Sequence, residues 1–179
     1  MDLELIRLTP DCKDKNYFEQ INEEAFPISE RMTMDDFFLL ASETDADVLG
    51  IYDAGRPIGF AIVVKNEECG YVNYFAIDQN CRSKGYGGAS LKKIFEAYPQ
   101  IQIILDFEEL DADAANIDQR IRRKNFYLRN GFHETGKHTL LRGNLFEVVC
   151  NKGALQEDAF KALIEVLHAH CPEFANVLI

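Results

Sequence analysis

The stretch YFAIDQNCRSKGYGGASL, residues 74–91, decides how this 179-residue chain folds. An apolar run ending at Ile77 leads through a polar loop into a helical pattern, which opens with closely spaced glycines: Gly85, Gly87 and Gly88. Because glycine has no Cβ, the N–H groups of such a turn can converge on an anion, and the helix N-terminus adds partial positive charge. Arg82 and Lys84 bring formal positive charge to the same turn. The stretch therefore predicts a phosphate site, with a purely structural turn as the alternative.

Two common nucleotide motifs do not fit this turn. The dinucleotide fingerprint GxGxxG would need a glycine where Ser90 stands, and the P-loop motif GxxxxGK[ST] occurs nowhere in the chain. Residues 82–88, RSKGYGG, instead resemble the RxxGxG/A motif of the GCN5-related N-acetyltransferase (GNAT) family. The resemblance implies that the turn holds the pyrophosphate of coenzyme A, with these contact residues: Arg82, Ser83, Lys84, Gly85, Tyr86, Gly87 and Gly88.

A second motif follows about forty residues later. The run RKNFYLRNGF, residues 123–132, resembles the family's helix-to-strand signature FYxxxGF. The resemblance covers about residues 3–135, and residues 136–179 match only in topology, as a last strand and a terminal helix. We therefore expect a single acetyltransferase domain over residues 1–179.

The hydrophobic pattern supports an α/β (α+β) fold. Expected strands span 3–8, 46–52, 58–64, 71–77, 101–107, a segment from Phe132 onward, and 145–149. Expected helices span 15–25, 33–42, a segment from the glycine turn to about Pro99, 113–128 with Asn130-Gly131 as its C-cap, and a last segment that includes 160–167. The resemblance implies a GNAT-type mixed, twisted sheet flanked by helices, with splayed central parallel strands.

Composition narrows the class of partner. Acidic residues outnumber basic ones by 30 to 19, for a net charge of −11, which disfavours a nucleic-acid partner. No uninterrupted apolar window of about 18 residues occurs, and the N-terminus does not read as a signal peptide. We therefore expect a soluble, cytoplasmic protein with no membrane partner. The five cysteines include no CxxC pair, and His168, His170 and Cys171 lack a fourth ligand, so we expect reduced thiols and no metal site.

The resemblance also implies the chemistry. Acetyl-CoA would be the co-substrate, and its acetyl group would pass directly to a primary amine. The backbone near Phe75 would point at the thioester carbonyl, and Ala76 and Ile77 would bond the pantetheine amides. Tyr127 would be the general acid, with a packed structural tyrosine as the alternative. Arg120 stands where many relatives have asparagine, and its basic helix either faces the cofactor phosphates or pairs with the acidic loop 108–113.

The base for the acceptor amine is less defined. Several relatives use a glutamate on the strand 71–77, but that strand carries no carboxylate here. Asp106 and Glu108 end the next strand and share a face by its alternation, so either is a candidate, and Glu30 is a third. The acceptor would be a small-molecule or peptide amine, and the net charge favours a cationic one. A non-catalytic acyl-CoA-binding module and a homodimer remain open alternatives.

Overall fold

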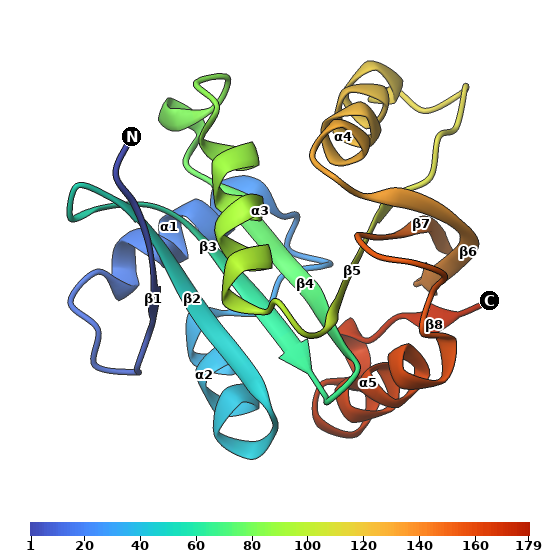
Figure 1. The fold of residues 1–179 in the computed structure, drawn as a ribbon, viewed down its shortest axis with the longest axis horizontal. Helices are drawn as coiled ribbons and strands as arrows, with labels where there is room; N and C mark the ends of the chain where they lie inside the picture. Colours follow the sequence, from blue (N-terminus) through green and yellow to red (C-terminus); the bar gives the residue numbers. More distant parts are fainter. The chain divides into compact units, whose positions relative to one another are not determined.

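The computed structural model describes residues 1–179, whose contacts divide into two compact units (Figure 1). Unit 1 comprises Met1–Asn66 and Val72–Pro99, and unit 2 comprises Glu67–Tyr71 and Gln100–Ile179. The strands are β1 (Leu3–Arg7), β2 (Ala46–Asp53), β3 (Arg56–Lys65), β4 (Cys69–Ile77), β5 (Gln102–Glu108), β6 (His133–Leu141), β7 (Asn144–Cys150) and β8 (Val177–Leu178). The main helices are α1 (Lys15–Ala25), α2 (Met34–Glu43), α3 (Tyr86–Ala97), α4 (Ile117–Arg129) and α5 (Glu157–His170). The sheet order is β1-β2-β3-β4-β5-β7-β6-β8.

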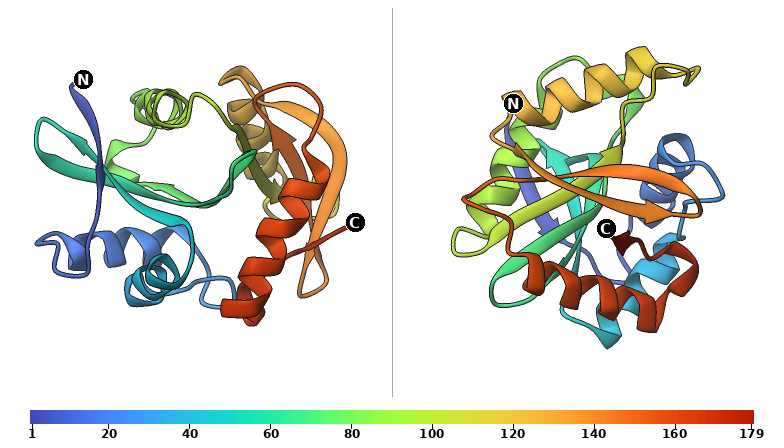
Figure 2. Two further views of the ribbon diagram at one scale, coloured as in Figure 1. Left: turned by 60° about the horizontal axis from the view of Figure 1, so that its bottom comes forward. Right: turned by 90° about the vertical axis from the view of Figure 1, so that its right-hand side faces the viewer.

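Unit 1 is built around an antiparallel arrangement of β1, β2 and β3. Helices α1 and α2 cover one face of these strands and α3 covers the other (Figure 2). A capping box starts α2, because the Thr33 side chain accepts from the Asp36 N–H while the Asp36 carboxylate accepts from the Thr33 N–H. The apolar face of α2 is buried, including Phe37 and Leu40.

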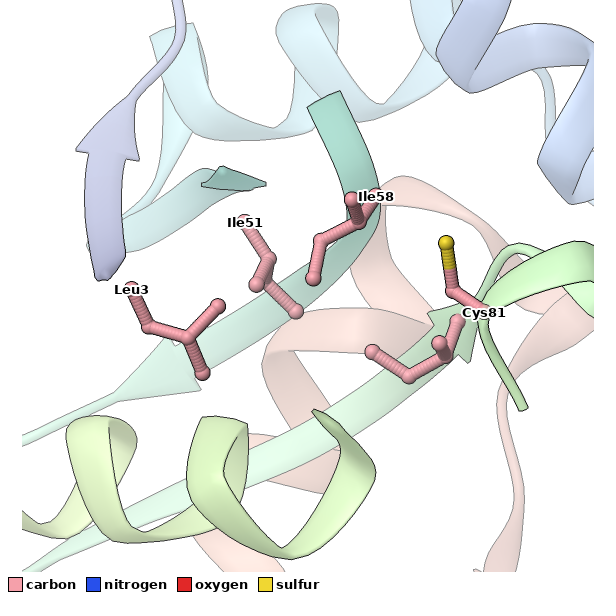
Figure 3. Packing of buried hydrophobic residues seen from close by; sticks show 5 residues of the cluster. Leu3, Ile51, Ile58 and Cys81 are labelled. Carbon is pink, nitrogen blue, oxygen red and sulfur yellow. The ribbon is translucent and has the colours of Figure 1, made fainter. Parts of the chain in front are cut away.

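The face of unit 1 beneath α3 holds an apolar cluster (Figure 3). Its buried members are Leu3, Ile51, Ile58, Ile77 and Cys81, and Leu5, Phe75, Tyr86 and Ala89 pack against it. A Cβ on Gly59 of β3 would collide with the carbonyl oxygen of Ala76, so β3 and the end of β4 approach closely. The segment that leads into the glycine turn is therefore fixed by backbone contact and by apolar packing.

Unit 2 is a mostly antiparallel arrangement in which β5 pairs with β7, β7 with β6, and β6 with β8. The first three residues of β4, Cys69–Tyr71, pair in parallel with Gln102–Ile104 of β5. Helices α4 and α5 lie on opposite sides of β6 and β7 (Figures 1 and 2). Gly131, at a φ of +95°, ends α4, and the Phe132 N–H donates back to the Tyr127 carbonyl at 3.3 Å.

The mixed sheet flanked by helices confirms the predicted fold class. The α4 helix begins at Ile117 rather than near residue 113, because Asp111 accepts hydrogen bonds from the Asp113 and Ala114 N–H groups and forms a turn there. The two-residue strand β8 was not predicted, since it is too short to show a pattern. All five cysteines are unbonded, as expected. No helix has the length and apolar character needed to cross a membrane. The splay of the parallel strands stays a prediction.

Candidate active site

The glycine turn of unit 1 leaves backbone donors without partners. Gly85 is the N-cap of α3 at a φ of +84°, and no side chain caps the helix. The first hydrogen bond of the helix runs from the Ala89 N–H to the Gly85 carbonyl at 3.2 Å. The N–H groups of Tyr86, Gly87 and Gly88 precede that bond and have no acceptor in the chain. Three uncapped amides at the positive end of a helix dipole suit an anion.

The side chains next to this turn leave those amides open. The Tyr86 hydroxyl donates to Asp53 Oδ2 at 2.5 Å, which turns the phenol away from a capping role. The Arg82 Nε donates to the Ile77 carbonyl at 3.0 Å, and the Lys84 Nζ donates to the Asn80 carbonyl at 2.8 Å. Arg82 and Lys84 are both exposed, so their positive charge stays available at the turn.

A carboxylate fixes the loop before the turn. Asp78 accepts from the Asn80 N–H at 2.8 Å and from the Tyr17 hydroxyl of α1. Burial opposes ionisation of Asp78, but these hydrogen bonds outweigh it and lower the pKa of its carboxyl. The same hydrogen bond raises the pKa of Tyr17 to about 12. The loop is therefore held by an ionised Asp78 and a protonated Tyr17.

Tyr127 of α4 lies in an aromatic environment within unit 2. Its ring stacks on Phe107 at a centroid distance of 5.3 Å and meets Phe126 and Phe132 edge to face at 5.1 and 5.8 Å. Its hydroxyl makes no hydrogen bond. Burial raises the pKa of Tyr127 to about 12, and the charge of Asp106 adds to that effect while Arg123 opposes it. The phenol therefore stays protonated at neutral pH with its proton uncommitted.

Asp106 of β5 lies in a hydrogen-bonded cluster of unit 2. The Tyr71 hydroxyl donates to Oδ1 at 2.9 Å, and the Asn176 Nδ2 donates to Oδ2 at 2.6 Å. The Thr139 hydroxyl also donates to Oδ2. Burial raises the pKa of Asp106, and these three hydrogen bonds, with one from its own backbone, oppose but do not cancel that shift. A carboxyl with a raised pKa is a stronger base than an ordinary aspartate.

Glu108 has different partners from Asp106. Its two oxygens pair with Arg120 at 3.1 Å and with Arg123 at 3.0 Å, both from α4. Arg120 also donates to the Glu109 carbonyl at 2.7 Å. The prediction that the basic helix pairs with the acidic loop is therefore confirmed for these two arginines. Both Glu108 oxygens are occupied by guanidinium groups, which leaves this carboxylate poorly suited to act as a base.

The remaining candidates make other contacts. Glu30 uses its carbonyl to accept from the Tyr74 hydroxyl at 2.6 Å. The side chains of Phe75 and Ile77 pack with the apolar cluster, so that stretch of β4 can contribute through its backbone. Sequence reasoning did not find Tyr71, Thr139 and Asn176 as partners of Asp106. They lie 35, 33 and 70 residues from it along the chain, so no local pattern links them.

A family model described as the acetyltransferase (GNAT) family matches residues 15–132, and this chain belongs to that family. A protein from Bacteroides thetaiotaomicron assigned to the GNAT acetyltransferases is similar in fold, with 22% identity, a TM-score of 0.73, and coverage of 96% of this chain and 99% of that chain.

Two ligand-bound structures share the fold at lower identity. A GNAT acetyltransferase from Elizabethkingia anophelis with acetyl-CoA bound is 9% identical, with a TM-score of 0.59 over 85% of this chain and 99% of that chain. An aminoglycoside 6'-N-acetyltransferase complexed with coenzyme A is 11% identical, with a TM-score of 0.59 over 82% and 95%. At such identities the likeness shows the fold. Comparison with functionally curated proteins gave no significant match.

Proposed function

We propose that the chain is an acetyl-CoA-dependent N-acetyltransferase that acetylates a primary amine of a small molecule or peptide. The observation that carries the proposal is the uncapped start of α3, where Tyr86, Gly87 and Gly88 present amides with no acceptor. Membership of the GNAT family supports the same reaction class. Acetyl-CoA and coenzyme A are the ligands named for the two structures with the same fold described above.

The residues of the turn fit the anionic part of acetyl-CoA. Free amides, a helix N-terminus and two exposed cations form a donor set suited to a pyrophosphate. When bound, acetyl-CoA supplies a thioester whose acetyl carbon can form a bond to an amine nitrogen as its bond to sulfur breaks. Ser83, at a φ of +61°, and Gly85 shape the turn that would hold the phosphates. The contacts proposed for the backbone of Phe75, Ala76 and Ile77 remain part of this proposal.

Tyr127 would hold the proton that the departing sulfur needs. The raised pKa keeps its phenol protonated through the physiological range, and no protein group competes for the proton. The packing of Phe107, Phe126 and Phe132 fixes the position of the ring, and with it the position of the hydroxyl. Such a phenol can donate its proton to a thiolate and then regain one of the protons that the acceptor amine loses.

Asp106 would take the proton that the acceptor must lose. An amine attacks only when neutral, so an ammonium acceptor gives up one proton before the new bond forms and a second as the amide forms. One of these protons replaces the proton that Tyr127 donates, and the other leaves to solvent. Asp106 suits this role better than Glu108, because both oxygens of Glu108 are occupied by arginines.

The rival function is an acyl-CoA-binding module without catalysis. The absence of a carboxylate from β4 favours it, since several relatives keep a glutamate there. The two functions predict different turnover. An enzyme releases the coenzyme A thiol at a rate that depends on the amine, whereas a binding module binds acetyl-CoA and releases nothing.

Thiol release tests the proposal directly. The protein would be mixed with acetyl-CoA and a panel of primary amines that includes a polyamine, an aminoglycoside and a short peptide with a free N-terminus. We expect amine-dependent release with at least one cationic member, because a net charge of −11 attracts cations. Binding of acetyl-CoA without release for any amine would support the rival reading instead.

A further inference from the structure

Asn176 belongs to the C-terminal segment, between the short helix η2 (Pro172–Phe174) and β8. Its side chain is nearly buried, at 6% exposure. The Nδ2 atom lies 2.6 Å from Asp106 Oδ2 and 3.0 Å from the Thr139 hydroxyl oxygen. The β8 ladder pairs Thr139 with Leu178, which holds Asn176 beside the end of β5. A residue from the last few positions of the chain therefore reaches the candidate base.

These side chains form one hydrogen-bond network in which Asp106 is the final acceptor. Asn176 donates to Thr139 and to Asp106, Thr139 donates to Asp106, and Tyr71 donates to the other carboxylate oxygen. Three side chains donate to this carboxylate, one to Oδ1 and two to Oδ2, and its own backbone supplies a further hydrogen bond. Asp106 is partly exposed, whereas Thr139 and Tyr71 are at 0% and 1% exposure. The buried partners thus fix a carboxylate that itself keeps partial exposure.

A purely structural role explains this arrangement less well. The C-terminal segment is already tied to β6 through the β8 ladder and by two backbone hydrogen bonds between His138 and Ile179, at 3.2 and 2.8 Å. No cationic side chain neutralises Asp106, and a desolvated carboxylate without a counter-ion is costly. Neutral side chains of similar shape would secure the segment without that cost. A site that receives a proton or a cation during the reaction accounts for retaining the charge.

We propose that Asn176, together with Thr139 and Tyr71, positions Asp106 as the base for the acceptor amine, so that the C-terminal segment completes the active site. The inference rests on the proposed function. The titratable groups that act on Asp106 are Tyr71 of β4 and Tyr127 of α4, while Thr139 of β6 and Asn176 do not titrate.

The first test uses the unaltered protein. The pKa of the Asp106 carboxyl would be measured by ¹³C NMR, with Asp106→Asn to assign the signal, and compared with the acidic limb of the turnover–pH profile. Turnover should rise with pH through that same pKa, because only the deprotonated carboxyl accepts a proton. A limb that lies elsewhere would overturn the inference.

The second test removes the donors one at a time. Asn176→Leu and Thr139→Val delete hydrogen bonds to the ionised form, so the Asp106 pKa and the acidic limb should both move up by about one pH unit. Turnover at a pH below the acidic limb should fall roughly tenfold, with unchanged affinity for acetyl-CoA. Thr139→Ser keeps the hydroxyl and should restore most of the loss. If Asn176→Leu does not fold, the comparison of Thr139→Val with Thr139→Ser tests the positioning role.

The outcomes separate this inference from the proposed function. Full turnover in a folded Asp106→Asn variant would show that Asp106 is not the base, and both proposals for this residue would fail. Loss of turnover in Asp106→Asn, with an unmoved acidic limb in Asn176→Leu and Thr139→Val, would refute the positioning role alone. If the unaltered protein shows no turnover, the proposed N-acetyltransferase function is refuted.

Discussion

The two units present polar groups in opposite ways. At the turn of unit 1, backbone amides that a helix cannot satisfy are left open beside exposed cations. In unit 2, Tyr127 and Asp106 are half-buried, and desolvation raises the pKa values of both. The first arrangement is suited to binding an anion, and the second to moving protons. Variants in unit 1 should therefore change affinity, and variants in unit 2 should change turnover.

The largest effect on turnover should come from Tyr127→Phe. Loss of the proton donor should lower turnover roughly 100- to 1,000-fold, the usual range for one general acid. Acetyl-CoA affinity should be unchanged, and the free energy of unfolding should change by less than about 0.5 kcal/mol, because the hydroxyl makes no hydrogen bond. Thiol release, calorimetry and urea denaturation measure the three quantities.

Tyr98→Phe is a matched control for that experiment. The pKa of Tyr98 is also raised, by burial and by its hydrogen bond to Asp47 at 2.6 Å, but Tyr98 belongs to unit 1. The turnover of the Tyr98→Phe variant should match that of the unaltered protein. Equal losses in the two variants would remove the distinction between the units.

A smaller effect is expected from Gly85→Ala. At a φ of +84° an alanine is strained by about 1 kcal/mol, and relief of that strain would distort the turn. Acetyl-CoA affinity should fall about tenfold, or about 1.4 kcal/mol, with little change in turnover at saturation. Gly55→Ala has a similar φ of +76° in the β2–β3 turn and no neighbour within 4 Å, so it should cost stability without affecting binding.

The smallest effect is expected from Lys84→Ala. Removal of one exposed charge should weaken acetyl-CoA binding about threefold, and the difference should vanish near 1 M salt, where the screening length is about 3 Å. Lys92→Ala removes an exposed charge on α3, outside the turn, and should leave the affinity unchanged. Titrations at two salt concentrations give the comparison. A loss that persists at high salt would contradict an electrostatic role.

The two units also differ in how far the sequence could predict them. The glycine turn is local, so its spacing and its two cations predicted an anion site next to a helix start, and the resemblance to FYxxxGF made Tyr127 a candidate. Strand alternation drew attention to Asp106 and Glu108 together. It could not show that α4 arginines occupy Glu108, because that contact depends on how a distant helix packs.

The partners of Asp106 were beyond sequence reasoning for the same reason. Thr139 and Asn176 are ordinary polar residues with no motif around them, and only the β6–β8 pairing brings Asn176 to β5. The fold class could therefore be predicted from the hydrophobic pattern and the family resemblance, and the glycine turn at the start of α3 from local spacing. The arrangement around the proposed base could not, since it depends on tertiary contacts between segments 33 to 70 residues apart.

In the proposed function, the start of α3 holds the phosphates of acetyl-CoA. Calorimetric titration tests it most directly, with the unaltered protein and with an Arg82→Ala, Gly87→Val double variant whose fold is checked by circular dichroism. We expect saturable binding to the unaltered protein and no measurable binding to the folded variant. Equal binding to both would contradict the location of the site, and binding to neither would contradict the proposed co-substrate.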